Sequence, residues 1–445
     1  MAEKMTISPT PAQPAAPMPH LRRDYTYYKG VFSGRAMPFA YLDLDLLAQN
    51  VREIVARAAG GSAQAGTRVP PVPAAEGWEE LQPPVAASGK RIRLASKSLR
   101  SVAVLRRLLA ADPAIQGIMS YSAQEAAFLA RQGFDDLLIG YPCWHELDIA
   151  AVAQATVAGS HITLMIDSVA HVEQIERVAH RYAVRLPLCL DLDMSLLVPG
   201  LHFGAWRSPI RTPEQARPII ERILQSQHVW LDGIMGYEAQ IAGVGNHYPK
   251  QTLKNALVRF LQGRSVRDVA ERRGAIFDLI KSYNLSLRFV NGGGTGSITS
   301  TREEPAVTEI TVGSGFYAPA LFDNYYNFRY RPAAGYAIEI VRRAAPTIYT
   351  CLGGGYVASG AAGRDKLPRP YLPEGARLDS LEAAGEVQTP IIYDGPERLA
   401  VGDPIFLRHS KAGELCERFT HLLLVSNGAI VDEVTTYRGD GQCFI

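Results

Sequence analysis

Eight short apolar segments, each followed by a stretch with helical periodicity, alternate along the middle of the chain. The first is "RIRLA" (91–95) and the last is "EITVGSGFY" (309–317), and stretches between them such as "AHVEQIERVAHRYA" repeat apolar residues every three to four positions. Apolar strands joined by helices favour parallel pairing, because a parallel connection has to cross the sheet. Eight such units over about 250 residues predict an α/β fold, a (β/α)8 barrel of the TIM type.

The segments on either side of this core have a different character. The first twenty residues are rich in Pro and Ala, and residues beyond Tyr330 alternate apolar side chains with turn residues, as in "GDPIFLRHS" (402–410). Such alternation is typical of a β domain. We therefore predict a disordered tail at 1–21, a barrel at 46–325 with a surface loop inserted at 61–90, and a C-terminal β domain formed by 326–445 together with 22–45.

The charge and the cysteines of the chain exclude several classes of protein. Lys and Arg number 46 against 44 Asp and Glu, and a formal net charge of +2 gives no field that argues for nucleic acid or a membrane surface. No apolar run reaches the length of about 18 residues that a membrane span needs, and the N-terminus lacks the layout of a signal peptide. Five scattered cysteines without C-x-x-C spacing indicate a reduced, cytoplasmic protein.

One lysine follows a predicted strand at its carboxyl end, where barrels of this type carry their functional groups. Lys97 comes directly after the segment 91–95 and lies between Ser96 and Ser98. If the strand end is buried, the ammonium is costly unless it is paired, neutralised or covalently used. An exposed or salt-bridged lysine is the alternative interpretation.

Two glycine-rich turns follow the last two predicted strands, "NGGGTGS" (291–297) and "VGSGFY" (312–317). Glycine allows positive φ and a close approach of backbone N–H groups to an anion, and barrels commonly bind a phosphate at this place. Ordinary tight turns use the same residues. Together with Lys97, these turns supply the parts expected for pyridoxal 5′-phosphate, an imine-forming amine and an anchor for the phosphate.

Matching stretches from about Pro38 to Gly439 resemble, in order, those of the fold-type III pyridoxal phosphate enzymes. They include "FAYLDLDLLAQNV", "ASKSLRS", "DDLLIGYP", "LDLDMSLLVPGLHFG", "GIMGYEAQIAG", "NGGGTGS" and "TEITVGSGFYAPALFDNYY". The chain is similar to alanine racemase-like enzymes, and more closely to their D-threonine aldolase and D-serine dehydratase branch. The resemblance implies a barrel followed by a β domain, a homodimer with a shared site, and a small D-amino acid as substrate.

The resemblance also assigns roles to single residues. Lys97 would be the catalytic lysine that binds pyridoxal phosphate and acts as a base at Cα of the substrate. Tyr237 and Gln240 would line the cofactor ring or the substrate, with ordinary packing inside the barrel as the alternative. The phosphate would be held by Gly293, Gly294, Thr295, Gly315 and Phe316.

The resemblance also implies a metal site. In this branch a divalent metal is bound by a histidine and by an aspartate or cysteine two positions later. His409 stands at the histidine position, but Lys411 stands at the second position, and a protonated amine is a poor ligand. Either Cys416, which suits zinc, or Glu414, which suits manganese or magnesium, supplies the second ligand, or the metal is lost.

The expected reaction is that of a pyridoxal phosphate-dependent lyase of the aldolase type, which cleaves a D-β-hydroxy-amino acid into glycine and an aldehyde. A D-serine or D-threonine dehydratase, which gives a keto acid and ammonia, is the first alternative. An amino-acid racemase is another, with Tyr356 as a second base from the partner subunit. A non-enzymatic pyridoxal phosphate carrier is the last, although such single-barrel relatives lack a β domain.

Overall fold

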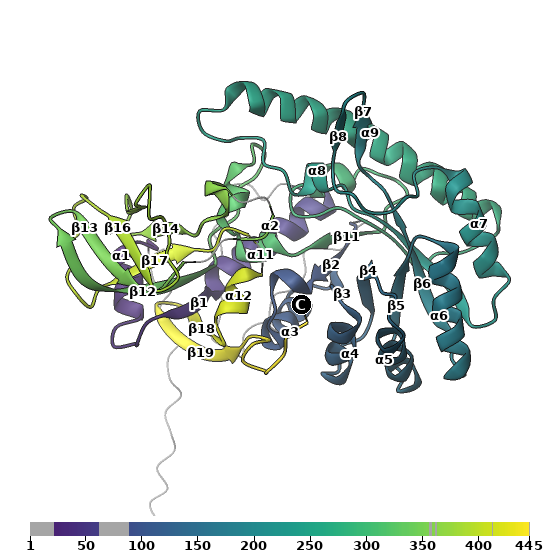
Figure 1. Ribbon diagram of the computed structural model, residues 1–445, viewed down its shortest axis with the longest axis horizontal. Coiled ribbons are helices and arrows are strands. Elements are labelled where there is room, and N and C mark those ends of the chain that lie inside the picture. Colours follow the sequence, from purple (N-terminus) through teal and green to yellow (C-terminus); the bar gives the residue numbers. More distant parts are fainter. Residues whose placement is uncertain (1–21, 62–88, 356–357, 361–362, 412, 445) are drawn as a thin grey trace, which may run out of the picture.

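The chain forms a barrel with its surrounding helices, joined to a separate sheet domain (Figure 1). The computed structural model describes residues 22–61, 89–355, 358–360, 363–411 and 413–444. The predicted tail at 1–21 and nearly all of the predicted loop at 61–90 lie outside these residues.

Eight parallel strands close the barrel in the spatial order β10-β11-β2-β3-β4-β5-β6-β9. All residues of β5 and β6 are buried, as expected of apolar strands that are covered on both faces. Every predicted apolar segment contributes one strand, so the predicted TIM-type barrel is confirmed. The strands are β2 (Arg91–Ala95), β3 (Ile115–Ser120), β4 (Leu137–Pro142), β5 (Ile162–Ile166), β6 (Leu186–Leu192), β9 (Val229–Gly236), β10 (Phe289–Gly292) and β11 (Glu309–Val312).

The helices around the barrel begin at residues that can cap them. The side chain of Ser122 accepts a hydrogen bond from a backbone N–H in the first turn of α4, and Ser168 does the same for α6. One face of each helix is apolar and buried against the strands, as for Val172, Ile175 and Val178 of α6. The helices are α2 (Leu44–Ala59), α3 (Val102–Ala111), α4 (Ala123–Arg131), α5 (Glu146–Val157), α6 (Val169–Arg181) and α7 (Pro213–Leu224).

Two features near the carboxyl ends of the strands were not predicted from the sequence. A small hairpin, β7 (Leu196–Val198) with β8 (Leu201–Phe203), follows β6, and the 31-residue helix α9 (Thr252–Ser282) runs along the upper edge of the molecule in Figure 1. Short helices follow three barrel strands: α8 (Ala239–Ala242), α10 (Ile298–Thr301) and α11 (Ser314–Tyr317).

A nine-stranded sheet forms the second domain, which confirms the predicted C-terminal β domain. Strand β1 (Phe39–Asp43) lies inside this sheet, antiparallel to β12 and parallel to β18, so residues before and after the barrel build it together. The helices α1 (Tyr25–Val31) and α12 (Glu414–Arg418) belong to the same domain. The other strands are β12 (Ala334–Ala345), β13 (Ile348–Leu352), β14 (Arg369–Leu372), β15 (Arg377–Leu378), β16 (Gln388–Ile392), β17 (Pro404–Arg408), β18 (His421–Ser426) and β19 (Ala429–Thr435).

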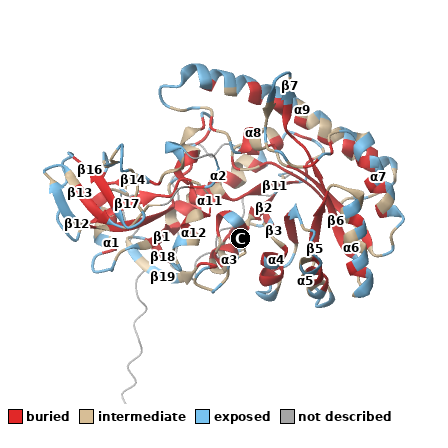
Figure 2. Ribbon diagram, in the orientation of Figure 1, coloured by how far each residue is buried: buried red, intermediate tan, exposed pale blue. Residues whose placement is uncertain are grey.

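Buried residues concentrate in the barrel strands and in the middle of the sheet (Figure 2). Inside the barrel the packed side chains are Leu138, Met165, Cys189, Met235 and Phe289. This layer fills the barrel, so a ligand can enter only above it, at a strand end. Among the helices that the structure describes, none combines the length and the apolar character needed to cross a bilayer.

Candidate active site

A cavity of about 460 Å³ opens at the carboxyl ends of the barrel strands and contains Lys97. Its volume is in the range of small-molecule sites, about 300–1,000 Å³. The barrel and the sheet domain form its wall together. Among its lining residues are Lys97, Ser98, Tyr141, Arg207, Tyr237, Asn291, Gly293, Gly294, Thr295, Thr311, Gly313 and Ser314 from the barrel side, and Ser359, Lys411, Glu414, Glu417 and Arg418 from the sheet domain.

Lys97 lies in a short 3-10 turn, Ser96–Ser98, directly after β2. The hydroxyl of Ser96 donates to the carbonyl oxygen of Met119 on the neighbouring strand at 2.9 Å, which anchors the turn. Both serines are buried, whereas Lys97 itself is exposed in the cavity. The amine is accessible to a ligand, as imine chemistry requires.

Tyr141, at the end of β4, is the hydrogen-bond partner of this amine. Nζ of Lys97 donates to the phenol oxygen of Tyr141 at 3.1 Å. Burial acts to raise the pKa of Tyr141, but the ammonium of Lys97 and the guanidinium of Arg207 outweigh it, and the pKa lies below its ordinary value. A phenol with a lowered pKa beside an amine is a pair that can exchange protons with a substrate.

Arg207 contacts both tyrosines of the cavity wall, Tyr141 and Tyr237. Its guanidinium lies 5.0 Å from the ring centre of Tyr141 and 5.7 Å from that of Tyr237, within the range of cation–π contacts. It donates to the carbonyl oxygen of Gly140 at 2.8 Å and forms an ion pair with Asp191 at 3.3 Å. Burial raises the pKa of Asp191 to about 6, against the opposite effect of Arg207. The arginine thus connects the two tyrosines to the ends of β4 and β6.

The first glycine-rich turn is fixed by the buried carboxylate of Glu238. Oε2 of Glu238 accepts from the N–H of Gly293 at 3.2 Å, and Oε1 accepts from the hydroxyl of Ser297 at 2.9 Å. The charge of Glu238 is balanced by Arg273 of α9, whose guanidinium lies 3.1 Å away and also pairs with Glu304. An ion pair without exposed surface therefore determines the backbone conformation of the turn.

Glycine is required at both turns by the space available. Gly293 has a φ of +79°, and a Cβ at this position would lie 2.7 Å from Cγ2 of Ile310. In the second turn, a Cβ at Gly313 would lie 2.6 Å from the hydroxyl oxygen of Ser98. The backbone therefore approaches the cavity more closely than a residue with a side chain would allow, which is the geometry of an anion-binding turn.

The structure divides the eight residues that the sequence assigned to the cofactor into two sets. Gly315 and Phe316 are buried behind the second turn, where the N–H of Gly315 donates to Oγ1 of Thr295 at 3.0 Å. Gln240 is also buried away from the cavity lining, and its amide donates to the carbonyl oxygen of Met194 at 2.6 Å. The residues that do line the cavity are Lys97, Tyr237, Gly293, Gly294 and Thr295.

The sequence analysis missed other lining residues, among them Asn291, Thr311, Tyr141 and Arg207. Asn291 and Thr311 face each other across β10 and β11 and are hydrogen-bonded at 2.8 Å. Thr311 and Tyr141 come from the ends of predicted strands. The rule that placed Lys97 in the site, that functional residues of a barrel lie at the carboxyl ends of its strands, could therefore have found them too. Arg207 comes from a long connection without periodicity, and nothing in the local sequence marks it.

The sheet domain contacts the lysine turn directly. Nε of Arg100 donates to the carbonyl oxygen of Lys97 at 3.0 Å, and the same guanidinium pairs with Glu417 of α12. Gly413, just before α12, has a φ of +82°, and a Cβ there would overlap the carbonyl oxygen of Lys97. The two domains are thus in backbone-to-backbone contact at the residue on which the site depends.

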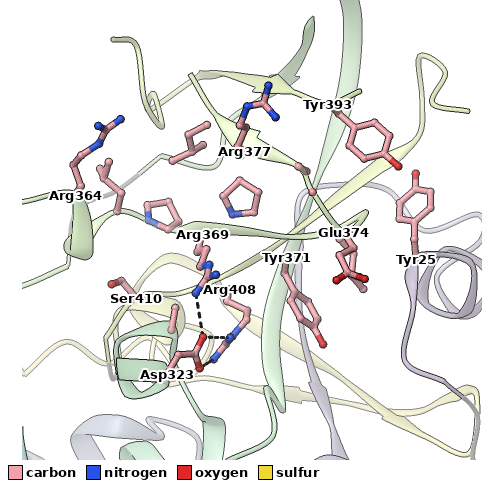
Figure 3. Close-up of a pocket in the computed structure, with 18 of the residues that line it drawn as sticks. Tyr25, Asp323, Arg364, Arg369, Tyr371, Glu374, Arg377, Tyr393, Arg408 and Ser410 are labelled. Carbon is pink, nitrogen blue, oxygen red and sulfur yellow. Dashed lines mark hydrogen bonds and ion pairs between the residues drawn. The ribbon is translucent and has the colours of Figure 1, made fainter. Parts of the chain in front are cut away.

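A second, larger cavity of about 1330 Å³ lies in the sheet domain (Figure 3). Arg408 and Arg369 both point to Asp323, which pairs with them at 2.8 and 3.2 Å. Six arginines and six acidic side chains line the cavity in all. With opposite charges in equal number and neither Lys97 nor a glycine-rich turn in its wall, this cavity lacks the chemistry of the first one.

The family model described as "Alanine racemase, N-terminal domain" matches residues 77–317, more than half of the chain. This protein belongs to that family. The match covers every strand of the barrel, including the turn of Lys97 and both glycine-rich turns. The resemblance stated from the sequence is therefore confirmed.

Three similar proteins are informative. A 3-hydroxy-D-aspartate aldolase of Paracoccus denitrificans (strain Pd 1222) is 22% identical over 228 residues, 51% of this chain and 53% of the relative, so the match spans about half of that curated protein. D-threonine aldolase from Filomicrobium marinum superposes with a TM-score of 0.72 at 14% identity, covering 92% of this chain and 96% of its own. D-threo-3-hydroxyaspartate dehydratase from Delftia sp. HT23 gives 0.61 at 15% identity, covering 93% and 99%.

The candidate metal ligands lie in different surroundings. His409 is buried, its pKa lowered to about 3 by burial and by Arg408, and Cys416 is buried with its pKa raised to about 12. Glu414 lines the cavity and accepts from the hydroxyl of Ser359 at 3.3 Å. The described part of the chain contains no group of three His, Cys, Asp or Glu placed to hold a metal ion. Two positions after His409 the chain carries Lys411, and a protonated amine has no lone pair for a divalent metal.

Tyr356, the candidate second base of a racemase, lies outside the described residues.

Proposed function

We propose that this protein is a pyridoxal phosphate-dependent lyase that cleaves D-β-hydroxy-amino acids into glycine and an aldehyde. The observation that carries the proposal is the accessible amine of Lys97 in one cavity with two glycine-rich turns. The substrate class is supported by the relatives, which are named as a 3-hydroxy-D-aspartate aldolase, a D-threonine aldolase and a D-threo-3-hydroxyaspartate dehydratase.

The cavity suits the cofactor in its size and in the residues that line it. Lys97 would hold the aldehyde carbon of pyridoxal phosphate, and the hydroxyls of Thr295 and Ser314 with the backbone around Gly293 and Gly313 would hold its phosphate. When bound, the cofactor supplies an electron sink for the electron pair that is released when a bond at Cα of the substrate breaks.

Aldol cleavage needs a base that takes the proton of the β-hydroxyl while the Cα–Cβ bond breaks. The phenol oxygen of Tyr141 is suited to this role, because its pKa is lowered and the guanidinium of Arg207 over its ring stabilises a negative charge. Nζ of Lys97 can then deliver a proton to Cα and complete glycine. The 3.1 Å hydrogen bond between Tyr141 and Lys97 returns the first proton to the amine, so the pair is restored after each cycle.

Dehydration is the second candidate, because the same two residues support it in the opposite protonation states. Lys97 as the free amine would take the proton from Cα, and Tyr141 as the phenol would protonate the leaving hydroxyl, which departs as water. The product then hydrolyses to a keto acid and ammonia. The relative named as a dehydratase shares the fold over nearly the whole chain.

The first experiment is an absorption spectrum of the purified protein titrated with pyridoxal phosphate. We expect a visible imine band for the wild type and for Lys281→Ala, a change at a lysine outside the cavity, and no band for Lys97→Ala. D-threonine and D-3-hydroxyaspartate are then added, with the L-isomers as controls. Glycine with an aldehyde identifies an aldolase, a keto acid with ammonia identifies a dehydratase, and formation of the other isomer identifies a racemase.

If the band also forms in Lys97→Ala, the cofactor is held elsewhere and the proposal is wrong. If the band depends on Lys97 but neither D-amino acid changes it, the lyase activity is wrong while the cofactor role stands.

We further propose a cytoplasmic homodimer. All five cysteines are free thiols, which supports a reducing compartment. Light scattering on the eluate of a size-exclusion column measures the mass directly, and a mass near that of one 48.6 kDa chain would refute the dimer.

A further inference from the structure

The segment that leaves β17 contributes side chains to two cavities. Arg408 and Ser410 line the larger cavity of Figure 3, whereas Lys411 lines the cavity of Lys97. The carbonyl oxygens of His409 and Ser410 accept from the N–H groups of residues 320 and 321, which holds the segment in this register. Lys411 is therefore the residue of this segment whose side chain reaches the site.

The charge of Lys411 is not neutralised by an ion pair. Its Nζ donates to the carbonyl oxygen of Ser359 at 3.3 Å, and among the described residues no carboxylate lies within 4.0 Å of it. Two other cations at the site are paired, Arg100 with Glu417 and Arg207 with Asp191. A lysine with one backbone partner keeps two N–H donors for a ligand in the cavity.

The position of Lys411 relative to His409 is informative in the light of the relatives. A cysteine-to-alanine variant of the related dehydratase has been solved in a metal-free form. In the present chain the imidazole of His409 is buried with no hydrogen-bond partner at either ring nitrogen among the described residues. The side chain that enters the cavity two positions later is an ammonium, which has no lone pair to give a metal.

We propose that the ammonium of Lys411 takes the place of a divalent metal and binds the β-oxygen of the substrate, so that this protein works without a metal. The inference rests on the proposed cleavage of a D-β-hydroxy-amino acid. A fixed positive charge near the β-oxygen favours loss of the hydroxyl proton to Tyr141, which is the role that a metal would otherwise fill. No bond forms between Lys411 and the substrate, and its proton stays on Nζ.

The test is zinc and manganese binding to the cofactor-loaded protein, measured by calorimetry after chelator treatment and by elemental analysis. We expect wild type and Lys411→Met to bind neither metal at a site that depends on His409. Lys411→Cys should gain about one equivalent of zinc, and His409→Asn in that background should abolish the gain. These measurements decide the metal part of the proposal even if no substrate is turned over.

The kinetic arm uses the substrate found in the first experiment. Lys411→Met should lower kcat/KM by about 10- to 100-fold, the size expected for a lost charge-assisted hydrogen bond, and Lys411→Arg should recover part of it. An unchanged cofactor absorption band shows that each variant is folded. Chelator should leave wild-type kcat unchanged.

Three results would overturn the proposal. They are one equivalent of metal in wild type that disappears in His409→Asn, loss of wild-type turnover with chelator that metal restores, and full kcat/KM in Lys411→Met. A Lys411→Cys variant that binds no zinc also counts against it, because residue 411 would then not stand at the ligand position.

Discussion

Replacing Arg273 by methionine removes the positive charge on which the glycine-rich turn at 291–297 depends. The guanidinium is fully buried and donates to the carbonyl oxygen of Gly236 at 2.9 Å. It also contacts the carboxylates of Glu238 and Glu304. Methionine fills a similar volume without a charge, so the variant leaves two buried carboxylates without their counter-charge.

We expect Arg273→Met to lower the free energy of unfolding by about 3–5 kcal/mol, the usual cost of removing one partner from a buried ion pair. Burial raises the pKa of Glu304 even with Arg273 beside it, so this carboxyl takes up a proton readily once the arginine is gone. The loss of stability should therefore be smaller at pH 5 than at pH 8. Because Glu238 holds the N–H of Gly293, the affinity for pyridoxal phosphate should fall as well.

Urea denaturation followed by circular dichroism measures the loss, with and without the cofactor. Arg267→Met, at an exposed position of the same helix, is the matched control and should behave like wild type. An unfolding free energy of Arg273→Met within about 0.5 kcal/mol of wild type, the range of ordinary surface changes, would refute the reasoning.

Three further predictions concern the surroundings of the site. Burial raises the pKa of the Glu125 carboxyl to about 7, so the folded protein binds the carboxyl proton more tightly than the unfolded chain does. The protonated carboxyl therefore contributes to stability fully below about pH 4.3, and this contribution is lost as the pH rises to 7. Between pH 5 and pH 7, urea denaturation should show wild type losing about 2–3 kcal/mol relative to Glu125→Gln, and parallel profiles would contradict this. Tyr141→Phe should lower kcat by about 100-fold while the cofactor band at Lys97 persists, since only a proton acceptor is removed. An unchanged kcat in assays of product formation would argue against Tyr141 as the base. Gly413→Ala should lower the melting temperature more than Gly402→Ala does. Both glycines have positive φ, but only at Gly413 would an added Cβ overlap a neighbouring atom. Equal melting temperatures of the two variants would contradict this prediction.

Much of the barrel could be predicted from the sequence, because buried parallel strands have a simple sequence pattern. Their residues are apolar on both faces and the turns that bound them are polar, so each strand end is marked in the local sequence. Lys97 and the turn at 291–297 were placed at strand ends for this reason. The same signal extends to Tyr141, which ends the strand "DLLIGYP".

The contacts that complete the site are not marked by any local sequence pattern. Arg273 and Glu238 are separated along the chain by a loop and most of a 31-residue helix, and their pairing follows only from how that helix lies over the barrel. Arg207 comes from an irregular connection, and its place between two tyrosines depends on the end of β6. The exposure of Lys97 could not be decided from the sequence, because the apolar residues of a strand indicate where the strand is buried and not the cavity beyond its last residue.

Strand β1 is made early during synthesis of the chain, but its neighbours in the sheet are made late. Phe39 pairs with Ala337, and Ala40 pairs with Leu422. The eight barrel strands all lie between residues 91 and 312, so on the ribosome the barrel can close before β12 and β18, the neighbours of β1, have been synthesised. The sheet domain then assembles last and brings α12 against the turn of Lys97. A nascent chain interrupted before β18 would hold a folded barrel whose lysine faces open water.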